Sequence, residues 1–300
     1  MANWNQITKD AQERGSTFDI IRKEALHNLS KYTKRNTIIY YSGWLQKSAP
    51  ELAQALSIND MDMNGFMTTI NGLDTAIGLD LILHTPGGEV AATEAIISYL
   101  QSKFEDIRAI VPQLAMSGGT MIACSTKQIV MGKHSSLGPV DPQINGVPAH
   151  GIVEEFNKAH SEIKNDPSKL AVWQFVLQKY PPNLVGECQK AIDWSVKIIE
   201  ANLRARMLDG KSNIDVLIEQ IKNELCDHAV SLSHSRHLSL SKCKEIGLEV
   251  LELESDQKLQ DLVLGVHHAT MQTIFNSPAF KIIENHKGQA FILGLGAQQK

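Results

Sequence analysis

The strongest constraint on the fold is an alternation of short apolar runs and helical segments between residues 78 and 131. The runs at 78–85, 107–111 and 128–131 have the length of strands and are mainly apolar. Continuous hydrophobicity is typical of parallel strands that are covered on both faces. Helical segments at 88–104 and 116–125 separate the runs, with short connections. This order predicts an α/β fold with a mostly parallel sheet and right-handed crossovers.

The whole chain divides into four predicted regions. These are an N-terminal amphipathic helix within 1–35, an α/β core over 36–147, a helical extension over 148–230, and a C-terminal α/β part with its tail over 231–300. Pro181 and Pro182 separate two helices, because the residue before a proline disfavours the helical conformation. Further expected elements are a strand at 37–43, a helix at 58–72, helices at 150–164, 168–179, 183–208 and 213–226, a capped helix and a strand within 238–254, a helix at 256–275 and an irregular tail at 287–300.

Composition and charge exclude several classes of function. A net charge of -4 leaves no basic excess, so nucleic acid is not an expected partner. The four cysteines form no CxxC pair, which argues against a zinc site or a disulfide framework. The polar N-terminus lacks the apolar segment of a signal peptide, and no run of about 18 apolar residues predicts a transmembrane segment. These features favour a cytoplasmic protein with reduced thiols.

Two glycine-rich turns each follow a predicted strand. The sequence HTPGG occupies 84–88, and AMSGGT occupies 115–120. Since the carboxyl ends of parallel strands meet at one edge of a sheet, we expect the two turns to face each other across a cleft. Taken alone, each motif also fits a tight turn or a helix N-cap, and neither matches GxSxG, GxGxxG or the P-loop pattern. Their pairing is what indicates a site.

The second turn predicts a nucleophile. Ser117 would present its hydroxyl above the sheet edge, and its small neighbours Gly118 and Gly119 would let a carbonyl group approach. The amide of Gly118 lies at a predicted helix N-terminus, where it can donate to an oxyanion. A second donor is expected from the turn at Gly87 and Gly88. Such donors lower a barrier by about 2.7–4 kcal/mol each, so these residues indicate acyl transfer.

These motifs resemble a known clan of serine peptidases. HTPGGEVAATEAI (84–96) resembles the glycine turn of the Clp proteases and of signal peptide peptidase A. AMSGGTMIACSTKQIVMGKHSSLGPVDPQI (115–144) resembles the nucleophile turn, the next strand and the following loop of the same clan. Segments 179–195 and 233–252 are also similar to this group. The pattern as a whole resembles the soluble prokaryotic family of serine dehydrogenase proteinases, which are related to signal peptide peptidase A.

The resemblance implies a Clp/crotonase-type spiral with a mostly parallel sheet and a helical C-terminal extension. It also implies peptidase activity on a peptide or protein substrate, no metal or cofactor, and assembly into a homo-oligomer. Residue by residue, it assigns Ser117 as the nucleophile. It assigns the oxyanion hole to the amides of Gly118 and of Gly88 or Gly87.

The resemblance leaves the general base open, with a Ser-Lys dyad as the expected form. A lysine base must be desolvated, so that it is largely neutral near pH 7. Lys179 precedes Pro181 and a long helix, which is the order in signal peptide peptidase A. Lys158 lies on the predicted helix after the loop, an interval that suits the shorter archaeal relatives. His134 is the histidine candidate, because the Clp proteases use a Ser-His-Asp triad.

Two other functions fit the same residues. A crotonase-type enzyme would use the same fold and oxyanion hole on an acyl thioester, although Lys127 and Lys133 offer a small basis for binding coenzyme A. A catalytically degenerate relative would serve as an oligomeric scaffold. A lysine or histidine within about 3.2 Å of the Ser117 hydroxyl, with allowance for a longer distance in a resting site, distinguishes a peptidase from a scaffold.

Overall fold

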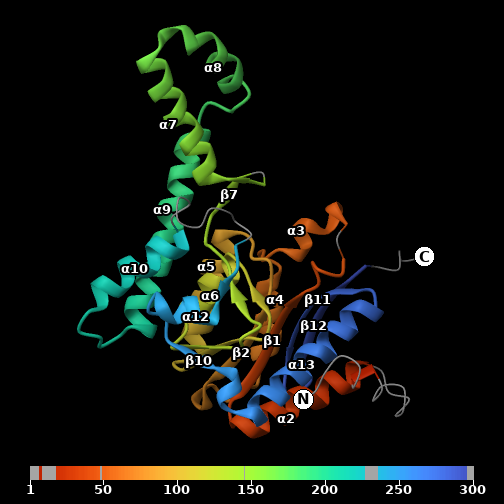
Figure 1. Ribbon diagram of the computed structural model, residues 1–300. Helices are drawn as coiled ribbons and strands as arrows, with labels where there is room; N and C mark the ends of the chain where they lie inside the picture. The colour runs from red at the N-terminus through yellow and green to blue at the C-terminus, as the bar shows by residue number, and fades with distance from the viewer. Residues whose placement is uncertain (1–6, 9–17, 48, 145, 227–235, 296–300) are drawn as a thin grey trace.

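The computed structural model describes residues 7–8, 18–47, 49–144, 146–226 and 236–295. A seven-stranded sheet lies at its centre, in the order β10-β5-β3-β2-β1-β11-β12 (Figure 1). From β10 to β1 the neighbouring strands are parallel, and β11 and β12 continue the sheet in antiparallel orientation. This mostly parallel sheet confirms the predicted α/β class. Its strands are β1 (Asn36–Ser42), β2 (Leu79–His84), β3 (Ile107–Val111), β5 (Gln128–Met131), β10 (Val250–Glu252), β11 (Ala279–Asn285) and β12 (Ala290–Gly294).

The central strands form because their side chains are buried on both faces of the sheet. Every residue of β1 and β2 is buried. Successive side chains of a strand point to opposite faces. Ile38 and Tyr40 therefore join one core cluster, whereas Ile39 and Tyr41 join another. A layer of helices covers each face.

The helices of the body form these two layers (Figure 1). Side chains of α4, α5, α6, α10 and α12 contribute to the first core cluster. α2 packs against α13, and both contribute to the second cluster. The bounds are α2 (Phe18–Thr33), α3 (Ala53–Leu56), α4 (Asp62–Ile70), α5 (Val90–Lys103), α6 (Gly118–Cys124), α10 (Ile214–Cys226), α12 (Leu240–Glu245) and α13 (Gln257–Asn276). Part of the predicted N-terminal helix, residues 9–17, lies outside the described residues.

An arm made of α7, α8 and the outer part of α9 projects from the body, with α8 at its far end (Figure 1). Its elements are α7 (Ala149–Asn165), the 3-10 turn η3 (Pro167–Lys169), α8 (Leu170–Leu177) and α9 (Leu184–Asn202). Pro181 and Pro182 lie between α8 and α9, as the sequence predicts. α9 continues into a π-helical turn. There Leu203 and Met207 pack in the first core cluster and attach the arm to the body. Among the helices of the described residues, none is long and apolar enough to cross a membrane.

Short strands surround the carboxyl edge of the sheet. One small sheet has the order β4-β6-β9, and β7 pairs with β8 at the base of the arm. The strands are β4 (Leu114–Ala115), β6 (Ser136–Leu137), β7 (Gln143–Ile144), β8 (Val147–Pro148) and β9 (Leu238–Ser239). The predicted loop after β5 therefore contains short paired segments.

The C-terminal hairpin differs from the sequence prediction. The sequence predicts an irregular tail from residue 287 and does not indicate the strand before it. The structure instead pairs β11 with both β1 and β12, and every residue of β11 is buried. The sequence does not indicate this strand because β11 contains the polar residues Lys281, Glu284 and Asn285. In the fold these residues are fully buried and bind partners from distant parts of the chain.

We expect Ile283→Ala in β11 to destabilise the protein by about 2–5 kcal/mol, because the Ile283 side chain is fully buried in the first core cluster. Ile292→Ala in β12 is the matched control, since the Ile292 side chain is 45% exposed. Its effect should stay within about 0.5 kcal/mol. Denaturant unfolding measures both free energies, and equal effects would mean that β11 does not belong to the core.

Candidate active site

The two glycine-rich turns lie side by side at the carboxyl edge of the sheet. The first follows β2, and the second joins β4 to α6. Thr85 and Ala115 form a parallel bridge between them. The amide of Thr85 donates to the carbonyl of Leu114 at 3.1 Å, and the amide of Met116 donates to the carbonyl of Thr85 at 3.0 Å. These backbone bonds bring the two turns to one edge of the sheet, as the sequence predicts, but in direct contact rather than across a cleft.

Ser117 has a strained backbone. Its φ is 48° and its ψ is -111°, outside the usual regions for a residue with a side chain. The amide of Gly119 donates to the carbonyl of Met116 at 2.7 Å, which closes a four-residue turn. These angles are close to those of the second residue of a type II′ turn, where glycine is the usual residue. Such strain is found where the surrounding structure holds a residue in place for a function.

The absence of side chains at 87 and 88 lets the turns approach each other. A Cβ atom on Gly87 would lie 2.6 Å from the Cβ of Ser117, and Gly87 has a positive φ of 93°. A Cβ on Gly88 would lie 2.2 Å from the carbonyl oxygen of Ile58. Neither distance is possible between real atoms, so glycine is required at both positions.

Two backbone amides next to Ser117 have no acceptor among the described residues. These are the amides of Gly88 and Gly118, neither of which forms a hydrogen bond within the described ranges. A Cβ on Gly118 would lie 3.4 Å from the Gly88 nitrogen, so the two amides are close neighbours. The amide of Gly87, by contrast, donates to the Thr85 hydroxyl at 3.2 Å. Of the two glycines that the sequence left open, Gly88 is therefore the one whose amide has no acceptor among the described residues.

The segment before α4 contributes to this site, although the sequence did not indicate it. The predicted helix at 58–72 begins only at Asp62, and Ile58 is extended and pairs in parallel with Gly88. The Ile58 amide donates to the Gly87 carbonyl at 2.7 Å, and the Glu89 amide donates to the Ile58 carbonyl at 2.9 Å. These hydrogen bonds join backbone atoms, so the residue types of this segment do not reveal them.

None of the three candidate bases forms a hydrogen bond with Ser117 in the described part of the chain. The Ser117 side chain forms no hydrogen bond within the described part of the chain. Lys158 is exposed on α7, and Lys179 is exposed two residues after α8, with its ammonium group 5.1 Å above the ring of Phe175. His134 is 44% exposed and lies 3.9 Å from the carboxylate of Glu254. Both lysines therefore belong to the arm, whereas His134 follows β5 in the body.

An aromatic cluster lies behind the first turn, on the α13 side of the sheet. The His84 ring lies 4.3 Å from the Trp44 ring, 5.3 Å from Tyr41 and 5.5 Å from His267, measured between centroids. Both ring nitrogens of His84 are buried and have no hydrogen-bond partner among the described residues. Burial lowers the pKa of His84 to about 3. Burial also lowers the pKa of His267, whose Nδ1 lies 3.0 Å from the Tyr41 hydroxyl. Burial among these rings therefore favours the neutral form of His84.

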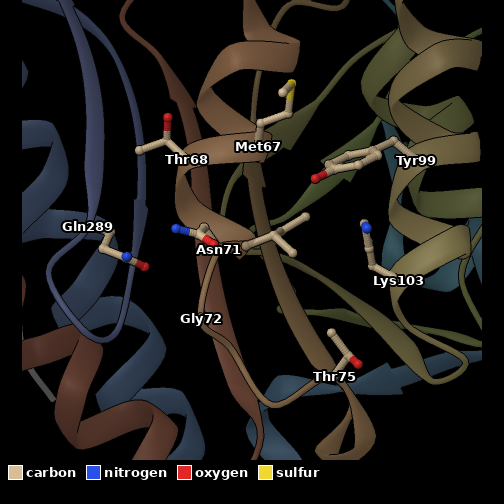
Figure 2. A pocket seen from close by; sticks show the side chains of 9 residues that line it. Met67, Thr68, Asn71, Gly72, Thr75, Tyr99, Lys103 and Gln289 are labelled. Atoms are coloured by element: carbon tan, nitrogen blue, oxygen red, sulfur yellow. The ribbon is translucent and has the colours of Figure 1, made fainter.

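Outside the two turns, the described residues contain no candidate metal cluster and no exposed thiol. Within the described ranges, no group of three or more His, Cys, Asp or Glu side chains could hold a metal ion. All four cysteines are buried free thiols. An open depression of about 660 Å³ between α4, α5 and the β11–β12 hairpin is lined partly by Asn71, Lys103 and Gln289 (Figure 2). Lys103 ends α5, whereas Gly88 precedes it, so the depression lies roughly 20 Å from the turns.

Comparison with known proteins supports a family assignment. The family described as ClpP-like SDH-type serine proteinase matches residues 54–273. Two uncharacterized proteins of Methanocaldococcus jannaschii are similar to the chain. One is 31% identical over 172 residues, which cover 57% of this chain and 51% of that protein. The other is 43% identical over 88 residues, which cover 29% of this chain and 31% of that protein. The chain thus spans about half or less of the length of these relatives.

Two solved structures also align with the chain. A serine-to-alanine mutant of the 1510-N membrane-bound stomatin-specific protease has a TM-score of 0.41 and 18% identity, over 68% of this chain and 78% of that one. A mutant of ClpP1 from Listeria monocytogenes has a TM-score of 0.39 and 11% identity, over 77% of this chain and 98% of that one.

The buried neutral His84 predicts a loss of stability in acid. Its pKa is about 3 in the folded protein, against an ordinary value of 6.5, so between these values only the unfolded chain binds the proton. The free energy of unfolding therefore falls as the pH drops below 6.5. For His84 alone, the loss at pH 4.5 is about 3 kcal/mol. His84→Phe, which keeps an aromatic ring in the cluster, should remove this part of the acid sensitivity.

The measurement is denaturant unfolding of the protein and its variants at pH 7.5 and pH 4.5. His160→Phe on the exposed surface of α7 is the matched control and should keep the full acid sensitivity. If His84→Phe loses as much stability in acid as the unmodified protein, His84 is not held neutral by burial.

Proposed function

Because this chain belongs to the ClpP-like SDH-type serine proteinase family, we propose that it is a serine peptidase with Ser117 as its nucleophile. The observation that carries the proposal is the strained turn at Ser117, packed against a glycine turn, with two free amides beside it. A strained strand-to-helix turn that exposes a serine hydroxyl is the arrangement of a nucleophile elbow. The free amides of Gly88 and Gly118 supply the donors that an oxyanion requires.

In the proposed reaction, the Ser117 Oγ attacks the carbonyl carbon of a peptide bond while its proton passes to a general base. The carbonyl oxygen becomes an oxyanion that accepts hydrogen bonds from the amides of Gly88 and Gly118. When the tetrahedral intermediate collapses, the C–N bond breaks and the leaving amine takes the proton from the base. Water then attacks the acyl-enzyme by the same steps, which releases the acid and restores the serine.

We further propose that the base is a lysine of the arm, contributed by a second copy of the chain. Lys158 and Lys179 are both exposed in a single chain, and the arm carries them away from the body (Figure 1). A lysine acts as a general base only where its side chain is desolvated, and neither of these lysines is buried in a single chain. Docking of the arm against the site of a neighbouring copy would desolvate the lysine and supply the missing proton acceptor. His134, in the body, is the alternative within one chain.

Ser117→Ala should lower hydrolysis of fluorescently labelled casein by at least about 10³-fold, because no acyl-enzyme can form. A fluorophosphonate probe should label the unmodified protein at Ser117, as read by mass spectrometry of its peptides. Ser102→Ala on the exposed surface of α5 is the matched control and should keep full activity and labelling. Full activity in Ser117→Ala would overturn the proposed function.

Mixing two inactive variants tests the origin of the base. If Lys179 acts on a neighbouring copy, Lys179→Ala is inactive alone, and mixing it with Ser117→Ala creates sites with an intact serine and an intact lysine. A random mixture should then recover about a quarter of the full activity. The same mixtures with Lys158→Ala and His134→Ala separate the three candidates. An inactive base variant that never recovers on mixing would place its residue in the same chain as Ser117.

A further inference from the structure

We infer that a buried ion pair between Lys281 and Asp62 positions the Gly87–Gly88 turn for oxyanion binding by fixing the backbone of Ile58. The inference rests on the proposed function, because it assigns a role to residues behind the proposed oxyanion hole. Lys281 and Asp62 do not touch the reacting atoms, so both are positioning residues.

The ion pair lies between β11 and the start of α4, and both side chains are fully buried. The Lys281 ammonium donates to the two carboxylate oxygens of Asp62 at 2.8 and 3.0 Å. Its third hydrogen bond goes to the main-chain carbonyl of Ser57 at 2.8 Å. The three donors of the ammonium group are therefore used in full, and one of them holds the residue directly before Ile58.

Asp62 holds the same segment from its other side. Its carboxylate accepts a hydrogen bond from the amide of Asn59 at 3.1 Å, directly after Ile58. The Tyr40 hydroxyl donates to the same carboxylate at 2.7 Å. Both neighbours of Ile58 are thus bound to one buried ionic group. This group is itself fixed to the sheet, because Tyr40 belongs to β1 and Lys281 belongs to β11.

Ile58 passes this constraint on to the proposed oxyanion hole. Its amide and carbonyl bond to Gly87 and Glu89 on either side of Gly88, which fixes the orientation of the peptide that carries the Gly88 amide. Its side chain reaches the second donor, because its Cδ1 atom lies 3.2 Å from where a Cβ on Gly118 would be. One residue therefore touches both turns that supply the proposed donors.

A contribution to stability alone is a weak explanation for this ion pair. A buried ion pair costs desolvation energy, and replacing it with apolar side chains of similar volume is often neutral or stabilising. Oxyanion donors, by contrast, act only within a narrow range, about 2.7–3.1 Å from the oxyanion. Displacement of the Ile58 backbone would move the Gly88 amide out of this range without removing any group that binds the substrate.

The test is the double variant Lys281→Met with Asp62→Asn, which removes both charges and leaves no unpaired ion in the core. We expect kcat for a fluorogenic peptide to fall by about 10- to 100-fold, while KM stays within about twofold of the original. Binding of a peptide aldehyde, whose adduct with Ser117 needs the oxyanion hole, should weaken by a similar factor. Lys287→Met is the matched control, because Lys287 on the same hairpin donates to the carbonyl of Gly72, away from the turns.

Tyr40→Phe is a milder second variant, since it removes one hydrogen bond to Asp62 and keeps the ion pair. We expect Tyr40→Phe to lower kcat by about 3- to 10-fold with KM unchanged. If the double variant does not fold, Tyr40→Phe alone tests the positioning role of the ion pair. Rates are expressed per folded molecule, from thermal unfolding under the assay conditions. An unchanged kcat in a folded variant, or parallel changes in kcat in Lys287→Met, would overturn the positioning role.

Failure of the proposed peptidase activity would give a different experimental result from failure of the positioning role. If the unmodified protein neither cleaves the peptide nor reacts with a fluorophosphonate at Ser117, the proposed peptidase activity fails before any variant is compared. If it does both, and the folded variants match it in kcat and aldehyde binding, only the role of Lys281 and Asp62 fails.

Discussion

The structure depends on the close approach of two backbone turns, and that approach is possible only where side chains are missing. The space that a Cβ on Gly87 would occupy is already filled by Ser117 and its neighbours, and the space beside Gly88 is filled by the backbone of Ile58. Three chain segments therefore meet with no side chain between them. The parallel strands bring the turns to one edge, and the bridge between Thr85 and Ala115 sets their register. The strain at Ser117 persists because its surroundings leave no other conformation open.

The sequence predicts these parts well because each has a strong local cause. The strands at 78–85, 107–111 and 128–131 are apolar runs bounded by turn residues, and a parallel sheet follows from their alternation with helices. The positions of Ser117, Gly87 and Gly88 at the sheet edge follow from the same topology. The motif could not show which of the two glycine amides is bonded within its own turn. That difference depends on the Thr85 hydroxyl, which accepts a bond from one amide and not from the other.

The remaining parts escape prediction because their causes are distant in the sequence. The strand β11 contains a lysine, a glutamate and an asparagine, which indicate exposure when read locally. In the fold they are buried against partners more than 200 residues away, including Asp62 and Arg22. The proposed general base escapes prediction for a related reason. The proton affinity of a lysine depends on its desolvation, and Lys158 and Lys179 are both exposed in a single chain.

The two buried charges of β11 also fix the register of the strand at the site. Lys281 points toward α4 and pairs with Asp62, whereas Glu284 points to the opposite face and pairs with Arg22 of α2. A slip of β11 by one residue would exchange the faces and leave each charge buried without its partner. Unpaired buried charges cost several kcal/mol, so the two ion pairs strongly favour this register. The polar residues that make β11 difficult to predict from the sequence are therefore the ones that specify its register. In this register, Lys281 lies beside the carbonyl of Ser57 and behind the Gly87–Gly88 turn.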